Sequence, residues 1–157
     1  SSKVLWRQFL QIHRASQSNL HLEGKLMNPE LLKYLNSIID RPIKLGETDC
    51  NTITARILDI LHGSNVHEQL TSHINPKTIR SKRASDVLLE LGYTKTDTPK
   101  VGDFILIPER WYDSCMFVWK PMWVISSFPR RFGKGNRKVR TMRLENMPEE
   151  AEVYTYA

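Results

Sequence analysis

The order of the hydrophobic patterns along this chain restricts its fold to one class. Up to about residue 91, apolar residues recur three and four positions apart, as on one face of a helix. From Val101 onward they gather in short runs rich in β-branched and aromatic residues, which favour strands. Helices followed by strands are typical of an α+β domain. We therefore expect an α+β fold, with N-terminal helices followed by a small antiparallel β-sheet.

Capping and turn residues set the expected boundaries of these elements. Asn28 and Asp49 are favourable N-caps, and Gly63 suits the end of a helix. Residues 64–75 favour a loop with a short helical turn. The expected helices cover residues 29–40, 49–62 and about 82–91, and the expected strands cover 101–108, 116–128, 137–144 and 152–156.

We expect two parts along the chain. Residues 1–22 are predicted to form an N-terminal helical arm or docking helix, because apolar residues recur in them at helical spacing. Trp6 and Phe9 belong to that pattern, and we predict that they contact a partner. Residues 23–157 are predicted to form a single α+β domain with a basic loop at 129–143.

Two tryptophans of the expected strand 116–128 form a second candidate for partner binding. Trp119 and Trp123 share one face of a strand with a two-residue period. An exposed pair of this kind suits association with another protein, because tryptophan is enriched in interface cores. The alternative is that both rings belong to the core of the sheet.

The composition excludes several classes of protein. With 157 residues, of which 40% are hydrophobic, the chain is long enough for one domain with a proper core. No apolar run approaches the roughly 20 residues that span a bilayer, so we expect no membrane span. Two cysteines, Cys50 and Cys115, are too few for a disulfide framework or a thiolate zinc site. We expect no cofactor and no metal site; a site at His67 and His73 is a weaker alternative that would need further ligands.

Positive charge is concentrated in one segment near the C-terminus. Between Ser114 and Leu144 the chain has no acidic residue, and glutamates follow immediately afterwards. Such a segment either contacts DNA or an acidic partner, or is a solvated loop and the outer face of an edge strand. Its eight basic residues are Lys120, Arg130, Arg131, Lys134, Arg137, Lys138, Arg140 and Arg143.

Cys50 is the residue with the most specific chemical placement. It follows Asp49 at the expected start of a helix, where backbone N–H groups lack partners and the helix dipole is positive. Both effects favour the thiolate, which is the nucleophilic form of cysteine. The placement therefore suits Cys50 as a candidate nucleophile, with Asp49 as a helix cap or an orienting residue. The structural alternative is a small buried side chain at a helix start.

Several short motifs occur in the order found in one known family. The chain resembles the NlpC-type branch of the papain-like cysteine peptidases, and most closely the small NlpC-like proteins of tailed bacteriophages and prophages. The resemblance covers residues 28 to 127 and implies a papain-like fold with Cys50 as nucleophile. The motifs that carry it are Arg41-Pro42, Gly46, Asp49-Cys50, Leu91-Gly92 and Val101-Gly102-Asp103.

The chain departs from that family at the catalytic histidine. The position that the histidine would occupy falls on Met122 or Trp123, and neither side chain accepts a proton. For the third, orienting residue only Asn136 and Thr141 are weak candidates. Acyl transfer needs a base within hydrogen-bond reach of the thiol. The resemblance therefore implies a fold that has lost part of its catalytic site.

These observations support three functional hypotheses. The favoured one is a bacteriophage virion-associated protein of the tail, connector or ejection apparatus, built on a degenerate NlpC-like fold, because assembly needs no catalytic base. It implies other phage structural proteins as partners, DNA as a further candidate, and a location in the virion or in the host cytoplasm before assembly. The alternatives are an active cysteine hydrolase that cleaves peptide or amide bonds in peptidoglycan and a basic nucleic-acid-binding protein.

Overall fold

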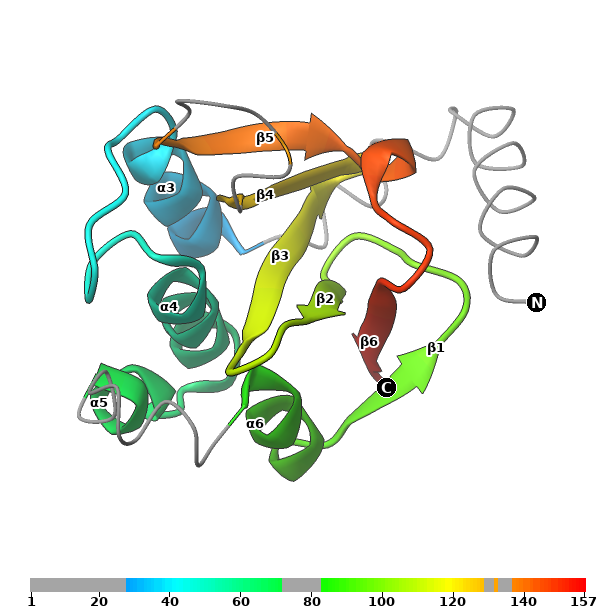
Figure 1. Cartoon of the computed structure of the whole chain (residues 1–157). Coiled ribbons are helices and arrows are strands. Elements are labelled where there is room, and N and C mark those ends of the chain that lie inside the picture. The colour runs from blue at the N-terminus through cyan, green and yellow to red at the C-terminus, as the bar shows by residue number, and fades with distance from the viewer. Residues whose placement is uncertain (1–27, 72–82, 129–131, 133–136) are drawn as a thin grey trace.

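A computed structural model of the chain describes residues 28–71, 83–128, 132 and 137–157. It confirms the α+β class: helices pack on one face of a six-stranded antiparallel sheet (Figure 1). The helices are α3 (Pro29–Ile38), α4 (Cys50–His62), α5 (Val66–Thr71) and α6 (Ala84–Glu90), with the 3₁₀-helix η3 (Leu144–Asn146). The strands are β1 (Tyr93–Thr96), β2 (Phe104–Pro108), β3 (Asp113–Lys120), β4 (Trp123–Ser127), β5 (Val139–Arg143) and β6 (Glu152–Tyr156).

The capping residues begin and end the two longest described helices as expected. The Asn28 side chain accepts a hydrogen bond from the Glu30 amide at 2.8 Å, and Pro29 opens α3. Asp49 is the N-cap of α4, and Gly63 ends this helix in the left-handed conformation with φ at 64°. These satisfied helix ends stabilise the start and stop of each helix. Leu31, Leu35 and Ile38 of α3 are buried against the core.

The sheet has the strand order β1-β6-β2-β3-β4-β5. Every neighbouring pair is antiparallel, and β6, the last strand in the chain, inserts between β1 and β2. The sequence did not predict β1, whose Thr-Lys-Thr stretch lacks an apolar alternation. It follows the helix terminator Gly92, which has φ at 100°. Strands β1 and β5 are thus the two ends of the sheet.

The expected single strand at 116–128 is wrong, because the chain folds back within it. Residues of β3 and β4 pair as an antiparallel hairpin, with Phe117 opposite Ile125 and Lys120 opposite Trp123. The turn contains Met122, whose φ of 72° lies in the left-handed region that a long side chain rarely adopts. Most residues from Met116 to Phe128 are apolar, so the hydrophobic pattern alone did not indicate the turn.

Alternate strand residues build a hydrophobic cluster on each face of the sheet. Phe104 and Phe117 face the helices and pack with Leu58 of α4. Ile105 and Val118 point to the opposite face and belong to a second cluster. That cluster also takes in three residues from the segment between β5 and β6, which are Leu144, Met147 and Ala151. Both faces are therefore buried, as the large share of apolar residues in these strands requires.

The predicted arm at 1–22 lies outside the described residues, as do Trp6 and Phe9. The division of the chain into an arm and a domain thus stays a prediction. Within the described ranges, each helix is too short or too polar to cross a membrane.

Candidate active site around Cys50

Asp49 organises the loop that leads into α4. Its carboxylate accepts hydrogen bonds from the Gly46 amide at 2.7 Å, the Thr52 amide at 3.2 Å and the Thr52 hydroxyl at 2.6 Å. The buried Thr48 hydroxyl ties the same loop to the Pro42 carbonyl at 2.7 Å. Asp49 therefore acts as the helix cap that the sequence predicted. Its two oxygens accept hydrogen bonds from the loop and from the first turn of α4.

Cys50 is the first residue of α4 and lies against β3. It is half-buried and packs on the helix-side cluster, which includes Cys115 of β3. The backbone amide of Cys115 interacts with the Cys50 thiol. The Thr54 hydroxyl in turn interacts with the Cys115 thiol. The predicted neighbourhood of the sulfur, a helix start beside an antiparallel sheet, is thus present.

The pKa of Cys50 shifts in the direction opposite to the one that a helix start alone favours. Burial raises the pKa of Cys50 from 9.0 to about 11, and the Asp49 carboxylate adds to the increase. The backbone amides of Cys115 and of the first turn oppose this effect but do not overcome it. The free-energy cost of removing a thiolate from water exceeds the electrostatic stabilisation that the helix terminus provides. At neutral pH the Cys50 side chain is therefore a thiol and a weak nucleophile.

No base replaces the missing histidine among the described residues. Met122 is only 6% exposed and packs in the second cluster, and Trp123 has the Arg143 guanidinium 5.4 Å from its ring centroid. Thr141 lies on β5 and pairs with Ile125, whereas Asn136 lies outside the described residues.

The two described histidines have other environments. His62 ends α4, and its Nε2 lies 2.7 Å from the Tyr93 hydroxyl. His67 in α5 donates its backbone amide to Asp59 at 3.0 Å. Neither imidazole is among the groups that shift the pKa of Cys50. Burial lowers the pKa of both histidines, so both are neutral at pH 7.

The tryptophan pair is not exposed in the way the sequence suggested. Trp119 is 7% exposed and belongs to the helix-side cluster, while the Lys120 ammonium lies 4.2 Å from its ring centroid. Trp123 is half-buried at the start of β4. The error arose because the two residues lie on different strands of a hairpin. A partner contact through Trp123 stays a prediction.

The basic segment is only partly described. Arg130, Arg131 and Lys134 lie outside the described residues, whereas Arg137 and Lys138 are exposed just before β5. Arg140 is half-buried: its Nη2 donates to the Phe132 carbonyl at 2.6 Å, and its guanidinium lies 5.5 Å from the Phe128 ring centroid. This arginine links Phe132 to β5. A contact with DNA or with an acidic partner therefore depends on the other basic residues.

The sequence did not predict a cluster of hydrogen bonds around the Arg83 guanidinium, here called the Arg83 clamp. Arg83 donates to the carbonyls of Glu109, Arg110 and Tyr112 and pairs with the Asp113 carboxylate at 3.0 Å. The same carboxylate accepts the Ser85 amide at 3.0 Å. Asp113 is only 2% exposed, so the pair fixes the β2–β3 turn to the start of α6. Local sequence patterns do not predict the Arg83 clamp, because its partners lie far apart in sequence.

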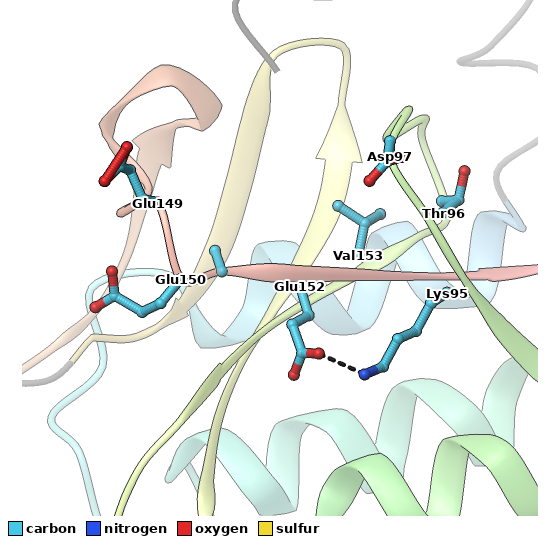
Figure 2. Close-up of a pocket in the computed structure, with 8 residues that line it drawn as sticks. Lys95, Thr96, Asp97, Glu149, Glu150, Glu152 and Val153 are labelled. Atoms are coloured by element: carbon cyan, nitrogen blue, oxygen red, sulfur yellow. Dashed lines mark ion pairs between the residues drawn. The ribbon is translucent and has the colours of Figure 1, made fainter. Parts of the chain in front are cut away.

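An acidic hollow beside β1 is a second feature that the sequence did not reveal. It has a volume of about 420 Å³. Figure 2 shows its carboxylates on both sides of β6, with one ion pair between Lys95 and Glu152 at 2.5 Å. Its polar lining residues are Lys95, Thr96, Asp97, Glu149, Glu150 and Glu152. In the described part of the chain, no three metal-ligating side chains are placed to hold an ion.

Comparisons with known proteins give no relative for this chain. No family model matches it, and neither does any curated protein or any solved structure.

Proposed function

We propose that this chain is a non-catalytic assembly module: a bacteriophage virion-associated protein of the tail, connector or ejection apparatus, built on a degenerate NlpC-like papain fold. The observation that carries the proposal is the state of Cys50. Its pKa of about 11 leaves the sulfur protonated at neutral pH, and neither His62 nor His67 acts on it. A nucleophile with neither a low pKa nor an adjacent base does not support acyl transfer.

Two further features support a binding role. The loop before α4 and the Arg83 clamp give the domain rigid, hydrogen-bonded turns. Rigid turns present a fixed surface to a partner at little entropic cost. The assignment to a virion rests on the resemblance of residues 28–127 to small NlpC-like phage proteins.

Incorporation into particles tests this function. We expect that deletion of residues 1–16 removes the protein from purified phage particles, while Cys50→Ala is incorporated like the wild type. Quantitative immunoblotting of gradient-purified particles measures both variants. Normal incorporation of the deletion variant would exclude docking through the arm, and absence of the wild-type protein from particles would contradict the virion assignment.

A cysteine hydrolase acting on peptide or amide bonds of peptidoglycan is the second candidate. The observation that favours it is the placement of Cys50 at the first turn of α4 beside β3. In this mechanism the Cys50 thiolate attacks the carbonyl carbon, and the Cys50 amide helps to hold the oxyanion. The C–N bond then breaks, the amine leaves with a proton from a general acid, and water hydrolyses the thioester to release the acid and the thiol. Wild-type protein would then cleave muropeptides and Cys50→Ala would not. Equal inertness of the two would exclude this candidate.

A further inference from the structure

A groove lies between α3 and α4, with α5 beside it. In Figure 1, helix α4 lies between α3 and α5. All three helices contribute side chains to the groove: Lys33 and Tyr34 from α3, Arg56 and Asp59 from α4, and His67 from α5. The groove has a volume of about 760 Å³, which is within the range of small-molecule binding sites. Its size therefore suits a small organic ligand.

Two cations of the groove keep their charge available for a ligand. Lys33 and Arg56 are exposed on different helices. Within the described part of the chain, neither side chain forms an ion pair. The planar guanidinium of an arginine offers two parallel N–H donors, which match two oxygens of a phosphate or carboxylate group. A lysine beside it adds a second, more mobile positive charge.

The carboxylates of the groove differ in how far they are already occupied. Asp59 accepts hydrogen bonds from the Ser64 hydroxyl at 2.7 Å, the Val66 amide at 2.7 Å and the His67 amide at 3.0 Å. Its two oxygens therefore serve as acceptors for the start of α5. Glu30 is exposed in the first turn of α3 and is the carboxylate of the groove that opposes a bound anion.

Tyr34 contributes a buried hydroxyl without a hydrogen-bond partner. Burial raises the pKa of Tyr34 to about 12, so the hydroxyl is a neutral donor at pH 7. The charges of Arg56 and Arg41 act on it more strongly than that of Asp49, and neither carboxylate of the groove contributes. The potential at this hydroxyl is therefore positive. Because its oxygen is shielded, the ring has to shift to meet a ligand, as side chains at binding sites commonly do.

We propose that this groove binds a small organic oxyanion, with Lys33 and Arg56 holding its phosphate or carboxylate group and the Tyr34 hydroxyl donating a further hydrogen bond. A bound oxygen satisfies a donor that is otherwise buried without a partner, which favours the complex. The ligand site goes beyond the assembly function and uses none of its premises, so it stands even if the virion assignment fails.

An NMR titration of the full-length chain tests the site with three probes of similar size: phenyl phosphate, benzoate and uncharged benzyl alcohol. We expect one of the two anions to shift the amide signals of α3 and α4 with a Kd of about 1 mM or lower. Binding should weaken between about 50 mM and about 500 mM salt, as the Debye length falls from about 14 to about 4 Å. The tighter anion identifies the group that the site prefers. Failure of both anions to bind, or equal binding of benzyl alcohol, would overturn the proposal.

Single substitutions identify the residues that hold the anion. K33Q, R56Q and Y34F should each weaken binding about tenfold, because each removes a donor to a charged group. Y34F also removes the unsatisfied hydroxyl, so thermal unfolding should show that this variant is at least as stable as the wild type. E30Q should bind more tightly. The control R137Q makes the same change in net charge away from the groove and should bind like the wild type. Equal affinities of K33Q, R56Q and R137Q would contradict this site, and an unchanged affinity of Y34F would exclude the hydroxyl from it.

Discussion

Asp49 contributes more to this fold than a single cap usually does. Its two oxygens accept three hydrogen bonds, from the loop before α4 and from the first turn of the helix. The same carboxylate raises the pKa of the neighbouring Cys50. The Asp49 carboxylate that caps the helix therefore also disfavours the thiolate form of Cys50. Stability and nucleophilicity make opposite demands on the charge of this position.

Removal of the Asp49 carboxylate should destabilise the domain. We predict that Asp49→Ala lowers the free energy of unfolding by about 2 kcal/mol, the upper range for loss of an N-cap, because Gly46 also loses its acceptor. Asp49→Asn keeps an acceptor oxygen and should cost about half as much. Urea unfolding followed by circular dichroism measures both variants. Equal losses for the two variants would show that charge, and not hydrogen bonding, is what matters here.

At the scale of elements, the Arg83 clamp joins parts of the chain that are distant in sequence. It connects the start of α6 with the turn between β2 and β3, through three carbonyls and the buried Asp113. The aromatic residues of that turn, Trp111 and Tyr112, are exposed. The clamp therefore gives a fixed backbone to a turn that would otherwise depend on its local hydrogen bonds alone.

We predict that Arg83→Ala lowers the free energy of unfolding by about 3 kcal/mol, because it leaves the Asp113 carboxylate buried without its cation. The double variant R83A/D113N removes the buried charge and should recover about half of that loss. Chemical unfolding of the wild type, both single variants and the double variant gives the coupling energy. Additive losses in this cycle would mean that the ion pair does not hold the turn.

The sequence predicted the helices better than the sheet, and there are physical reasons for this. Local residues determine where α3 and α4 begin, so Asn28 and Asp49 were sufficient evidence. The β3–β4 turn was missed because Met122 is apolar and buried despite its left-handed backbone. The polar strand β1 exists only because β6 pairs with it, and no local pattern encodes that pairing.

The candidate site shows the same division. The cap and the position of Cys50 at the helix start follow from neighbouring residues and were predicted. The pKa of its thiol depends on how α4 packs against Cys115 of β3, which lies 65 positions further along the chain (115 minus 50). Burial is a property of the whole molecule. The helix terminus alone therefore gave the wrong direction for the pKa of this thiol.

For the whole molecule, the proposed non-catalytic function requires Cys50 to be a weak nucleophile at neutral pH. The pKa of the thiol is raised, so the neutral thiol predominates below about pH 11, and half of the Cys50 side chains are ionised when the pH reaches about 11. Iodoacetamide reacts with the thiolate alone. Its rate of reaction at Cys50, followed by peptide mapping, therefore reports the ionisation of this thiol in the folded protein.

The most direct test is the pH dependence of this alkylation, with circular dichroism at each pH to confirm that the protein remains folded. We predict a midpoint near the raised pKa of about 11. At pH 7 the rate should be about a hundredfold slower than in the urea-unfolded chain, because two pKa units separate the two states. A midpoint below pH 7, with faster reaction in the folded protein, would contradict the non-catalytic function and identify Cys50 as a reactive nucleophile.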